Sequence, residues 1–221
     1  MTLWSEFLTN QGRVIHKWTH YFPIYESHFA RYVNRPATFI EIGCGQGGSL
    51  QLWKRYLGPF ARIVGIDINE SCRTFVEDQI EVRIGDQKDP QFLGKILEEF
   101  GTPDVVLDDG SHMMADITAT FQYLYPRTAP GGVYMVEDLH TAYWDEFDGG
   151  AGRAGSFIEL CKPLIDELNA DHARGQVSVT DFTKSTLSMH FYDSVVVFER
   201  GRHLKKHAPQ IGKPVRKSWM L

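Results

Sequence analysis

Short hydrophobic runs alternate with longer stretches of helical periodicity from residue 37 onward. Five runs are brief, rich in β-branched residues and bounded by Gly, Pro or Asp, and we predict buried strands at 37–42, 62–68, 81–85, 104–109 and 132–138. Residues 49–57, 90–100 and 114–125 place hydrophobic side chains on one face, as amphipathic helices do. This alternation predicts a Rossmann-like α/β fold, with a mostly parallel sheet, helices on both faces and ligands bound beyond the carboxyl ends of the strands.

The pattern changes after residue 138. A polar, Gly-rich loop at 141–155 is long for a compact domain and predicts a lid or binding loop. We expect a helix over 156–169 and two late strands, one near Val177 and one over 188–199, which bring the sheet to seven strands. The chain therefore divides into an aromatic N-terminal helical extension (1–36), a main domain (37–200) and a basic tail (201–221).

Composition narrows the function classes. The chain has 221 residues, enough for one large domain, and a net charge of −5, which argues against general nucleic-acid binding. Its 3 cysteines are widely spaced and match neither a disulfide framework nor a zinc site. No segment approaches the roughly 20 apolar residues that span a bilayer, and the N-terminus lacks a signal-peptide core. We expect a cytoplasmic protein without nucleic-acid or membrane partners, whose basic tail is solvated or contacts another subunit.

A glycine-rich turn follows the first predicted strand. Gly43, Gly45 and Gly48 allow a sharp turn and close approach to a ligand, but they also satisfy the pattern of a dinucleotide site, and an unliganded turn needs the same glycines. The acidic residue before them, Glu41, discriminates between cofactors. Its carboxylate suits a cationic amino-acid group and would repel a pyrophosphate.

Acidic residues also follow the second and third predicted strands. Asp67 is placed to accept both hydroxyls of a ribose, and Asp86 to accept the amino group of adenine. We assign Gln87 and Asp108 to the same cofactor site, although a helix N-cap accounts for Asp108 equally well. With Glu41, these residues indicate S-adenosylmethionine (SAM) rather than NAD.

A second acidic group lies at the ends of the fourth and fifth predicted strands. Asp109, Glu137 and Asp138 would repel one another at a shared rim unless a divalent cation binds between them or basic residues pair with them. An all-oxygen set favours Mg²⁺, Mn²⁺ or Ca²⁺ over zinc. His112 lies three residues after Asp109, on the same face of a beginning helical turn, and is suited to act as a general base.

For three residues near these clusters, the sequence gives less specific evidence of a role. Lys17 and Tyr21 in the N-terminal segment are candidates to close over the methionine carboxylate of SAM or over the acceptor, and we assign them to the cofactor site. Packing of an aromatic helix against the sheet accounts for them equally well. For His140, beside the acidic pair, we favour a structural role.

Taken together, the motifs FIEIGCGQGGS, GIDIN, DDGSH and VEDLHTAYW resemble the class I SAM-dependent, Mg²⁺-dependent sugar O-methyltransferases, over roughly residues 13–200. The resemblance implies a class I methyltransferase fold, a metal bound by Asp109, Glu137 and Asp138, and His112 as the base. It also implies methyl transfer to a hydroxyl of a sugar, oligosaccharide or glycosylated small molecule. The short chain favours the compact mycobacterial type, which methylates the 1-OH of methylmannose oligosaccharides, and we expect a homo-oligomer, most simply a dimer.

Three alternatives remain at this stage. A catechol-type O-methyltransferase would use the same carboxylates on an aromatic acceptor, although the polar loop at 141–155 suits a sugar better. An NAD-linked sugar oxidoreductase would explain the glycine turn but not Glu41 or the acidic cluster. A SAM-binding protein without activity would need neither a metal nor a base.

Overall fold

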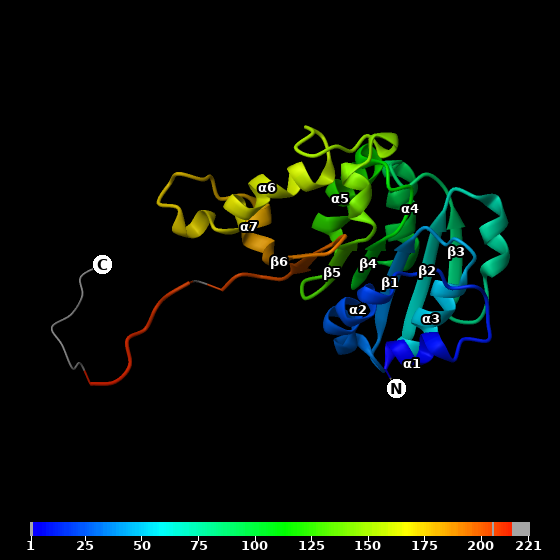
Figure 1. Ribbon diagram of the computed structural model, residues 1–221. Coiled ribbons are helices and arrows are strands. Elements are labelled where there is room, and N and C mark those ends of the chain that lie inside the picture. The colour runs from blue at the N-terminus through cyan, green and yellow to red at the C-terminus, as the bar shows by residue number, and fades with distance from the viewer. Residues whose placement is uncertain (1, 205, 214–221) are drawn as a thin grey trace.

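The computed structural model describes residues 2–204 and 206–213, and a single sheet forms its centre (Figure 1). The order of its seven strands is β3-β2-β1-β4-β5-β7-β6. The first five strands are parallel, and β7 runs antiparallel to both β5 and β6. The strands are β1 (Ala37–Ile42), β2 (Ala61–Asp67), β3 (Ile80–Ile84), β4 (Val105–Asp108), β5 (Val133–Val136), β6 (Thr186–Tyr192) and β7 (Val195–Arg200). The predicted Rossmann-like fold with seven strands is confirmed.

Helices cover both faces of the sheet. The α-helices are α1 (Leu3–Leu8), α2 (Phe22–Phe29), α3 (Gly48–Leu57), α4 (Pro90–Phe100), α5 (Met114–Leu124), α6 (Phe157–Leu168) and α7 (Asp181–Ser185). Short 3₁₀ turns occupy Thr19–Tyr21, Ala30–Tyr32, Glu70–Phe75, Tyr125–Arg127, Leu139–Tyr143, Asp145–Phe147 and Ala170–His172. Helices α1, α2 and α3 share one hydrophobic layer with the sheet, and α4, α5 and α6 share the other.

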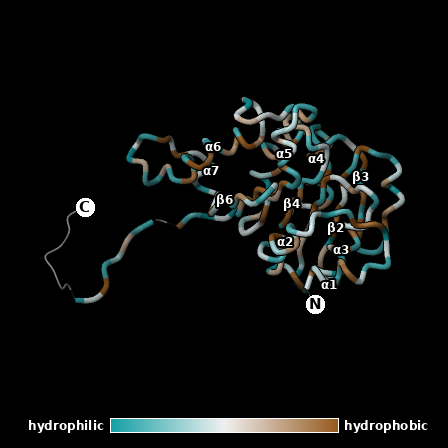
Figure 2. The backbone as a smooth tube through the Cα atoms, viewed as in Figure 1, coloured by the Kyte–Doolittle hydropathy of each residue, from teal (hydrophilic) through white to brown (hydrophobic). Residues whose placement is uncertain are grey.

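Alternation along each strand sends side chains into both layers. In β1, Phe39 packs with Trp53 and Phe29 on the α2–α3 side. Its neighbour Ile40 joins the other layer with Phe121 of α5. The strands buried between the layers are accordingly hydrophobic on both faces, as expected of parallel strands (Figure 2). Burial of both faces holds the carboxyl ends of the strands at one rigid edge.

The N-terminal segment links helices α1 and α2 by crossing that carboxyl edge. Arg13 donates to the carbonyl oxygen of Phe75 and lies over its ring, with the guanidinium carbon 4.9 Å from the ring centroid. Four residues later, Lys17 reaches the acidic residues at the ends of β4 and β5. We call residues 10–18, which connect these contacts, the strap.

Two predicted late elements differ from the structure. The described residues contain no strand near Val177: the chain makes a 3₁₀ turn at Ala170–His172, and Thr180 then caps α7 through a capping box. The predicted strand at 188–199 is a hairpin, split by a turn at Asp193 and Ser194, where Ser194 has φ 65°. Two alternating valines cannot form a strand without an edge to pair with, whereas a two-residue turn reverses the chain and builds two strands.

Other predictions agree closely. Helix α4 spans the predicted 90–100, and α6 begins after its N-cap Ser156, whose side chain accepts from Glu159 N–H. The 141–155 loop contains 3₁₀ turns and is not wholly irregular. All three cysteines are free, and within the described ranges no helix is long and apolar enough to cross a membrane. Of the basic tail, Lys206 pairs with Asp171, while residues 214–221 lie outside the described residues.

Candidate active site

Three cavities adjoin one another along the carboxyl ends of the strands. The first, about 190 Å³, is lined by residues after β2 and β3, including Asp67, Asp86 and Gln87. The second, about 330 Å³, is lined by the glycine turn, the strap and His112. The third, about 340 Å³, lies between Lys17 to Tyr21 and the acidic residues after β4 and β5. The first two share Gly43, so the elongated space runs along the edge that the sequence predicts for ligands.

The glycine turn is shaped by close backbone contacts. Gly43 has φ +89°, and a Cβ there would lie 2.0 Å from the carbonyl oxygen of Asp109. Gly45 has φ +50°, and a Cβ there would meet no atom within 4 Å. Packing against β4 therefore requires glycine at 43, whereas position 45 faces open space at the second cavity.

The predicted cofactor residues differ in their placement. Asp67 and Asp86 line the first cavity, and both also accept backbone N–H groups: Asp67 from Cys44 and Asn69, Asp86 from Lys88. Gln87 donates to the buried carboxyl of Asp108 over 3.2 Å. Burial raises the pKa of Asp108 to about 7. Asp108 is buried and lines none of these three cavities, in agreement with a supporting role.

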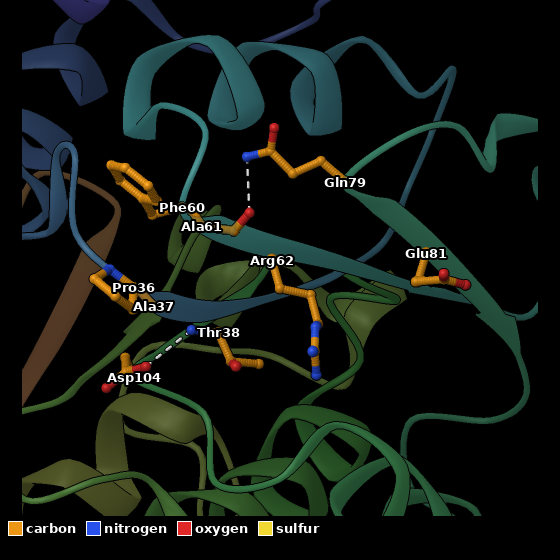
Figure 3. A pocket seen from close by; sticks show the side chains of 9 residues that line it. All are labelled: Pro36, Ala37, Thr38, Phe60, Ala61, Arg62, Gln79, Glu81 and Asp104. Carbon is orange, nitrogen blue, oxygen red and sulfur yellow. Dashed lines mark hydrogen bonds between the residues drawn. The ribbon is translucent and has the colours of Figure 1, made fainter.

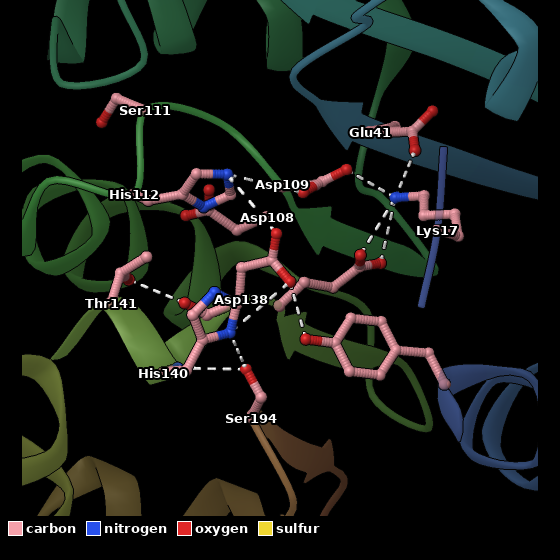
Figure 4. A network of polar contacts seen from close by, with 12 residues as sticks. Lys17, Glu41, Asp108, Asp109, Ser111, His112, Asp138, His140, Thr141 and Ser194 are labelled. Carbon is pink, nitrogen blue, oxygen red and sulfur yellow. Dashed lines mark hydrogen bonds and ion pairs between the residues drawn. The ribbon is translucent and has the colours of Figure 1, made fainter. Parts of the chain in front are cut away.

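A buried ammonium group lies among three of the acidic residues (Figure 4). Lys17 Nζ is 2.6 Å from Asp109 Oδ2, 3.0 Å from Glu137 Oε2 and 3.3 Å from Glu41 Oε1. Burial alone lowers the pKa of Lys17, but these carboxylates raise it more, and the net pKa lies well above the usual value. Lys17 therefore neutralises part of the cluster, a role that its assignment to SAM does not describe.

Asp109 and Asp138 each divide their two oxygens between different neighbours. Lys17 binds Asp109 Oδ2, and the Tyr21 hydroxyl donates to Asp138 Oδ1 over 2.6 Å. The other oxygens, Asp109 Oδ1 and Asp138 Oδ2, both face His112 Nε2 at 3.8 Å. One ligand atom from each of Asp109, His112 and Asp138 lies within 4.8 Å of the others, a spacing that could hold a metal ion. The N-terminal segment thus leaves one oxygen of each aspartate directed at the same space.

Glu137 and Glu41 lie on the buried side of Lys17. Glu137 also accepts from the Tyr25 hydroxyl over 2.6 Å, and Glu41 accepts from the Ser49 hydroxyl over 2.8 Å. Burial raises the pKa of Glu137 to about 8, although Lys17 opposes the shift, and burial raises the pKa of Glu41 as well. Glu41 Oε1 has the Lys17 ammonium nearby but no hydrogen bond. Three carboxyl groups around one ammonium, with Asp138 beside them, leave a surplus of negative charge that favours a further cation or proton.

His112 reaches Asp109 by a different route from the expected one. Helix α5 starts at Met114, and His112 lies before it in the left-handed region with φ 58°. The predicted helical turn is therefore wrong, although the two side chains do meet. A non-glycine residue in this region is strained, and such strain is concentrated at functional sites. His140 bonds Ser194 Oγ through Nδ1 over 2.6 Å, in agreement with a structural role.

Two contacts of the site were not predicted from the sequence. Tyr25, like Lys17 and Tyr21, is a candidate from the N-terminal segment to close over the cofactor or the acceptor, but only its place on α2 brings its hydroxyl to Glu137. Ser194, which contacts His140, lies in the turn between β6 and β7, and we did not predict that turn from the sequence. The aromatic richness of the N-terminal segment was the available signal for Tyr25, and Asp193-Ser194 was the turn signal for Ser194.

A further cavity, about 460 Å³, lies elsewhere (Figure 3). It is at the amino ends of the strands, where Asp104 accepts from the backbone N–H of Thr38. Apart from Arg62, Glu81 and Asp104, its lining is uncharged, and no cluster of possible metal ligands falls there. Ligands of open α/β sheets bind at the opposite, carboxyl edge, so the chemistry belongs with the acidic cluster.

Known proteins share the sequence and the fold of this chain. No family model matches the chain. It is 35% identical over 216 residues to mycinamicin VI 2''-O-methyltransferase of Micromonospora griseorubida, covering 90% of this chain and 52% of that protein. It is 36% identical over 194 residues to 8-demethyl-8-alpha-L-rhamnosyl tetracenomycin-C 2'-O-methyltransferase of Streptomyces olivaceus, covering 81% of this chain and 50% of that protein. The chain thus spans about half the length of the curated relatives it matches.

Among solved structures, the mycinamicin methyltransferase MycE in complex with Mg, S-adenosylhomocysteine and mycinamicin VI matches with a TM-score of 0.80. The two are 34% identical, and the match covers 94% of this chain and 54% of that chain. The sheet order and the glycine turn define a class I methyltransferase domain. Within that class, the chain is similar to about half of the length of macrolide and rhamnosyl sugar O-methyltransferases.

Proposed function

We propose that this protein is a SAM-dependent, divalent-metal-dependent O-methyltransferase that methylates a hydroxyl of a sugar or glycosylated small molecule. The observation that carries the proposal is the convergence of Asp109, Asp138 and His112 beside the cavity at the glycine turn. The matched relatives are sugar O-methyltransferases, and MycE was crystallised with Mg and S-adenosylhomocysteine. The 1-OH of a methylmannose oligosaccharide remains one predicted acceptor among several.

The cavities fit SAM in shape and chemistry. Asp67 and Asp86 are exposed to the first cavity, where a ribose and an adenine would find acceptors. Open space at Gly45 lets a ligand approach the backbone. The unbonded Oε1 of Glu41 is an available acceptor, although Lys17 lies between it and the cavity, so we propose the amino-acid contact of Glu41 as indirect.

The acidic cluster fits a hard divalent cation. Asp109 Oδ1 and Asp138 Oδ2 would hold it, because their other oxygens are already bonded to Lys17 and Tyr21. We retain Glu137 as a predicted ligand, although its oxygens bond Lys17 and Tyr25. Oxygen donors of this kind suit Mg²⁺.

The mechanism assigns one task to each side chain. Asp109 and Asp138 would bind the cation and orient it toward the acceptor hydroxyl. His112 Nε2, which faces the same space, takes the proton of that hydroxyl. When bound, the cation makes that hydroxyl more acidic and SAM supplies the methyl group. The strap lines the second and third cavities beside Lys17. The number of subunits, the division at 36 and 200 and the cytoplasmic location stay predictions from the sequence.

The test is transfer of labelled methyl from SAM to a panel of sugars and glycosides, with catechols as comparison acceptors, in Mg²⁺ and in excess EDTA. We expect sugar labelling that EDTA abolishes. Labelling of catechols alone, or sugar labelling that resists EDTA, would contradict the proposal.

A His112→Ala variant separates the base from the binding site. Loss of a general base lowers turnover by about 10²–10⁴-fold. SAM affinity is expected to stay unchanged, since His112 is not assigned to the cofactor. The matched control is His140→Ala, which removes a neighbouring imidazole bonded to Ser194. Equal turnover in wild type and His112→Ala would remove His112 from the mechanism.

A further inference from the structure

Aromatic rings surround the acidic cluster on its solvent side. Trp18 of the strap lies 5.9 Å from His140, and His140 lies 4.8 Å from Trp144, measured between ring centroids. Trp144 is 6.1 Å from Phe147, which is 6.3 Å from His112. These contacts join the strap to the 139–147 segment in a continuous row, which we call the aromatic rim.

The two indoles of the rim are exposed in a way that core packing does not explain. Trp18 is 54% exposed and Trp144 is 44% exposed. By contrast, Trp53 is fully buried, and Trp4 packs against Phe7 and Phe22. Trp18 lines the third cavity, and Trp144 adjoins Trp18 through His140. Exposed large apolar side chains that cluster beside a cavity mark a binding surface.

The third cavity, which Trp18 lines, combines polar and apolar surface. Its lining includes Lys17, Tyr21, Asp109 and Asp138, which offer an ammonium, a hydroxyl and carboxylates. A ligand for this space needs hydrogen-bonding groups on one side and an apolar face on the other. A pyranose ring has both, since its hydroxyls lie around the edge and its C–H groups form the faces.

Neighbouring rings of the rim are inclined to one another. The planes of Trp18 and His140 are inclined by 81°, and those of His140 and Trp144 by 62°. His140 therefore does not cover the face of either indole by parallel stacking. His140 is held by Ser194, which keeps the spacing between the two indoles.

Building on the proposed function, we propose that Trp18 and Trp144 form a carbohydrate platform: the C–H face of the acceptor pyranose packs on the indoles while its hydroxyls point to Asp109 and Asp138. The platform comes from two segments far apart in the chain, the strap and the loop after β5. It makes the strap part of the acceptor site, and it selects pyranosides carrying an apolar face next to adjacent hydroxyls.

The experiment uses the full chain with Mg²⁺ and S-adenosylhomocysteine, and methyl α-L-rhamnopyranoside and methyl α-D-mannopyranoside as probes. Saturation-transfer NMR measures contact with the sugar C–H protons, and steady-state assays with SAM measure KM and kcat. Variants are Trp18→Ala, Trp144→Ala and the ring-retaining Trp18→Phe. Phe60→Ala is the matched control, because Phe60 is 63% exposed at the opposite edge of the sheet. S-adenosylhomocysteine affinity of each variant reports that the domain is folded.

We expect each alanine variant to lose saturation transfer and to raise the KM for the sugar by roughly three- to tenfold, with a smaller effect on kcat. Trp18→Phe restores most of the affinity, and Phe60→Ala matches wild type. Unchanged sugar KM in both alanine variants overturns the platform while leaving the proposed function intact. Sugar binding that depends on the indoles without methyl transfer supports the platform and defeats the proposed function. Absence of pyranoside binding to wild type, or binding of catechol in its place, overturns the platform.

Discussion

Replacing Lys17 by Met tests whether the buried ammonium holds the acidic cluster together. The Lys17 side chain is 3% exposed and pairs with Glu41, Asp109 and Glu137. Methionine keeps a similar length and removes the charge. The substitution therefore leaves buried carboxylates without their cation while it changes the packing little.

The expected loss of unfolding free energy in Lys17→Met follows from the burial of these ion pairs. Removing one partner of a buried ion pair costs about 3–5 kcal/mol of unfolding free energy. Asp109 is 21% exposed and can recruit water, and Tyr25 and Ser49 still donate to Glu137 and Glu41. These remaining partners place the expected loss near the lower end, about 3 kcal/mol.

The loss must depend on pH. Burial raises the pKa of Glu137 to about 8, so the folded state binds a proton that the unfolded state has released. Stability from this group is present below the unfolded pKa and is lost as pH rises through about 8. Without Lys17, the Glu137 carboxyl is harder still to ionise. The loss of unfolding free energy in Lys17→Met is therefore largest above about pH 8 and smaller below it. Mg²⁺ is expected to reduce the deficit, since it supplies positive charge.

Urea unfolding in EDTA, at about pH 5 and about pH 9, measures both effects. The control is Lys54→Met, because Lys54 pairs with Glu77 near the surface, where each side chain is over a quarter exposed, and such pairs contribute about 1 kcal/mol or less. A deficit of Lys17→Met below about 1 kcal/mol at the higher pH, or one that grows as pH falls, would refute the reasoning.

Three further predictions concern single groups. Tyr21→Phe removes a hydrogen bond that orients a carboxylate of the metal set and is expected to weaken Mn²⁺ or Mg²⁺ affinity about tenfold by calorimetry; equal affinities would contradict this. Gly43→Ala forces a Cβ to 2.0 Å from the Asp109 carbonyl oxygen, so its unfolding free energy should fall well below that of the control Gly101→Ala, which has a similar φ but no atom within 4 Å. Burial raises the pKa of Asp108 to about 7, so wild-type stability falls as pH rises from about 4 to 7, and Asp108→Asn should flatten that slope in denaturation series.

Local sequence patterns were sufficient to predict the main strands and helices. The runs 37–42 and 90–100 match β1 and α4 in full, because periodicity, Gly and Pro boundaries and chain topology act over short stretches of sequence. Topology then brought Asp67, Asp109 and Asp138 to one edge, since parallel strands end together. The same reasoning failed at Val177, where two alternating valines that pair with no strand of the sheet form none themselves.

By itself, the sequence determined the sheet, the glycine turn and the chemical types gathered at the carboxyl edge. The tertiary structure decided which of these side chains face one another. Lys17 lies 92 residues from Asp109 and 120 from Glu137 along the chain, and its contact with them exists only because α2 and the strap pack against the sheet. Tyr21 likewise selects one oxygen of Asp138 and leaves the other facing His112. Such pairings depend on burial and long-range packing, which a local pattern of residues does not encode.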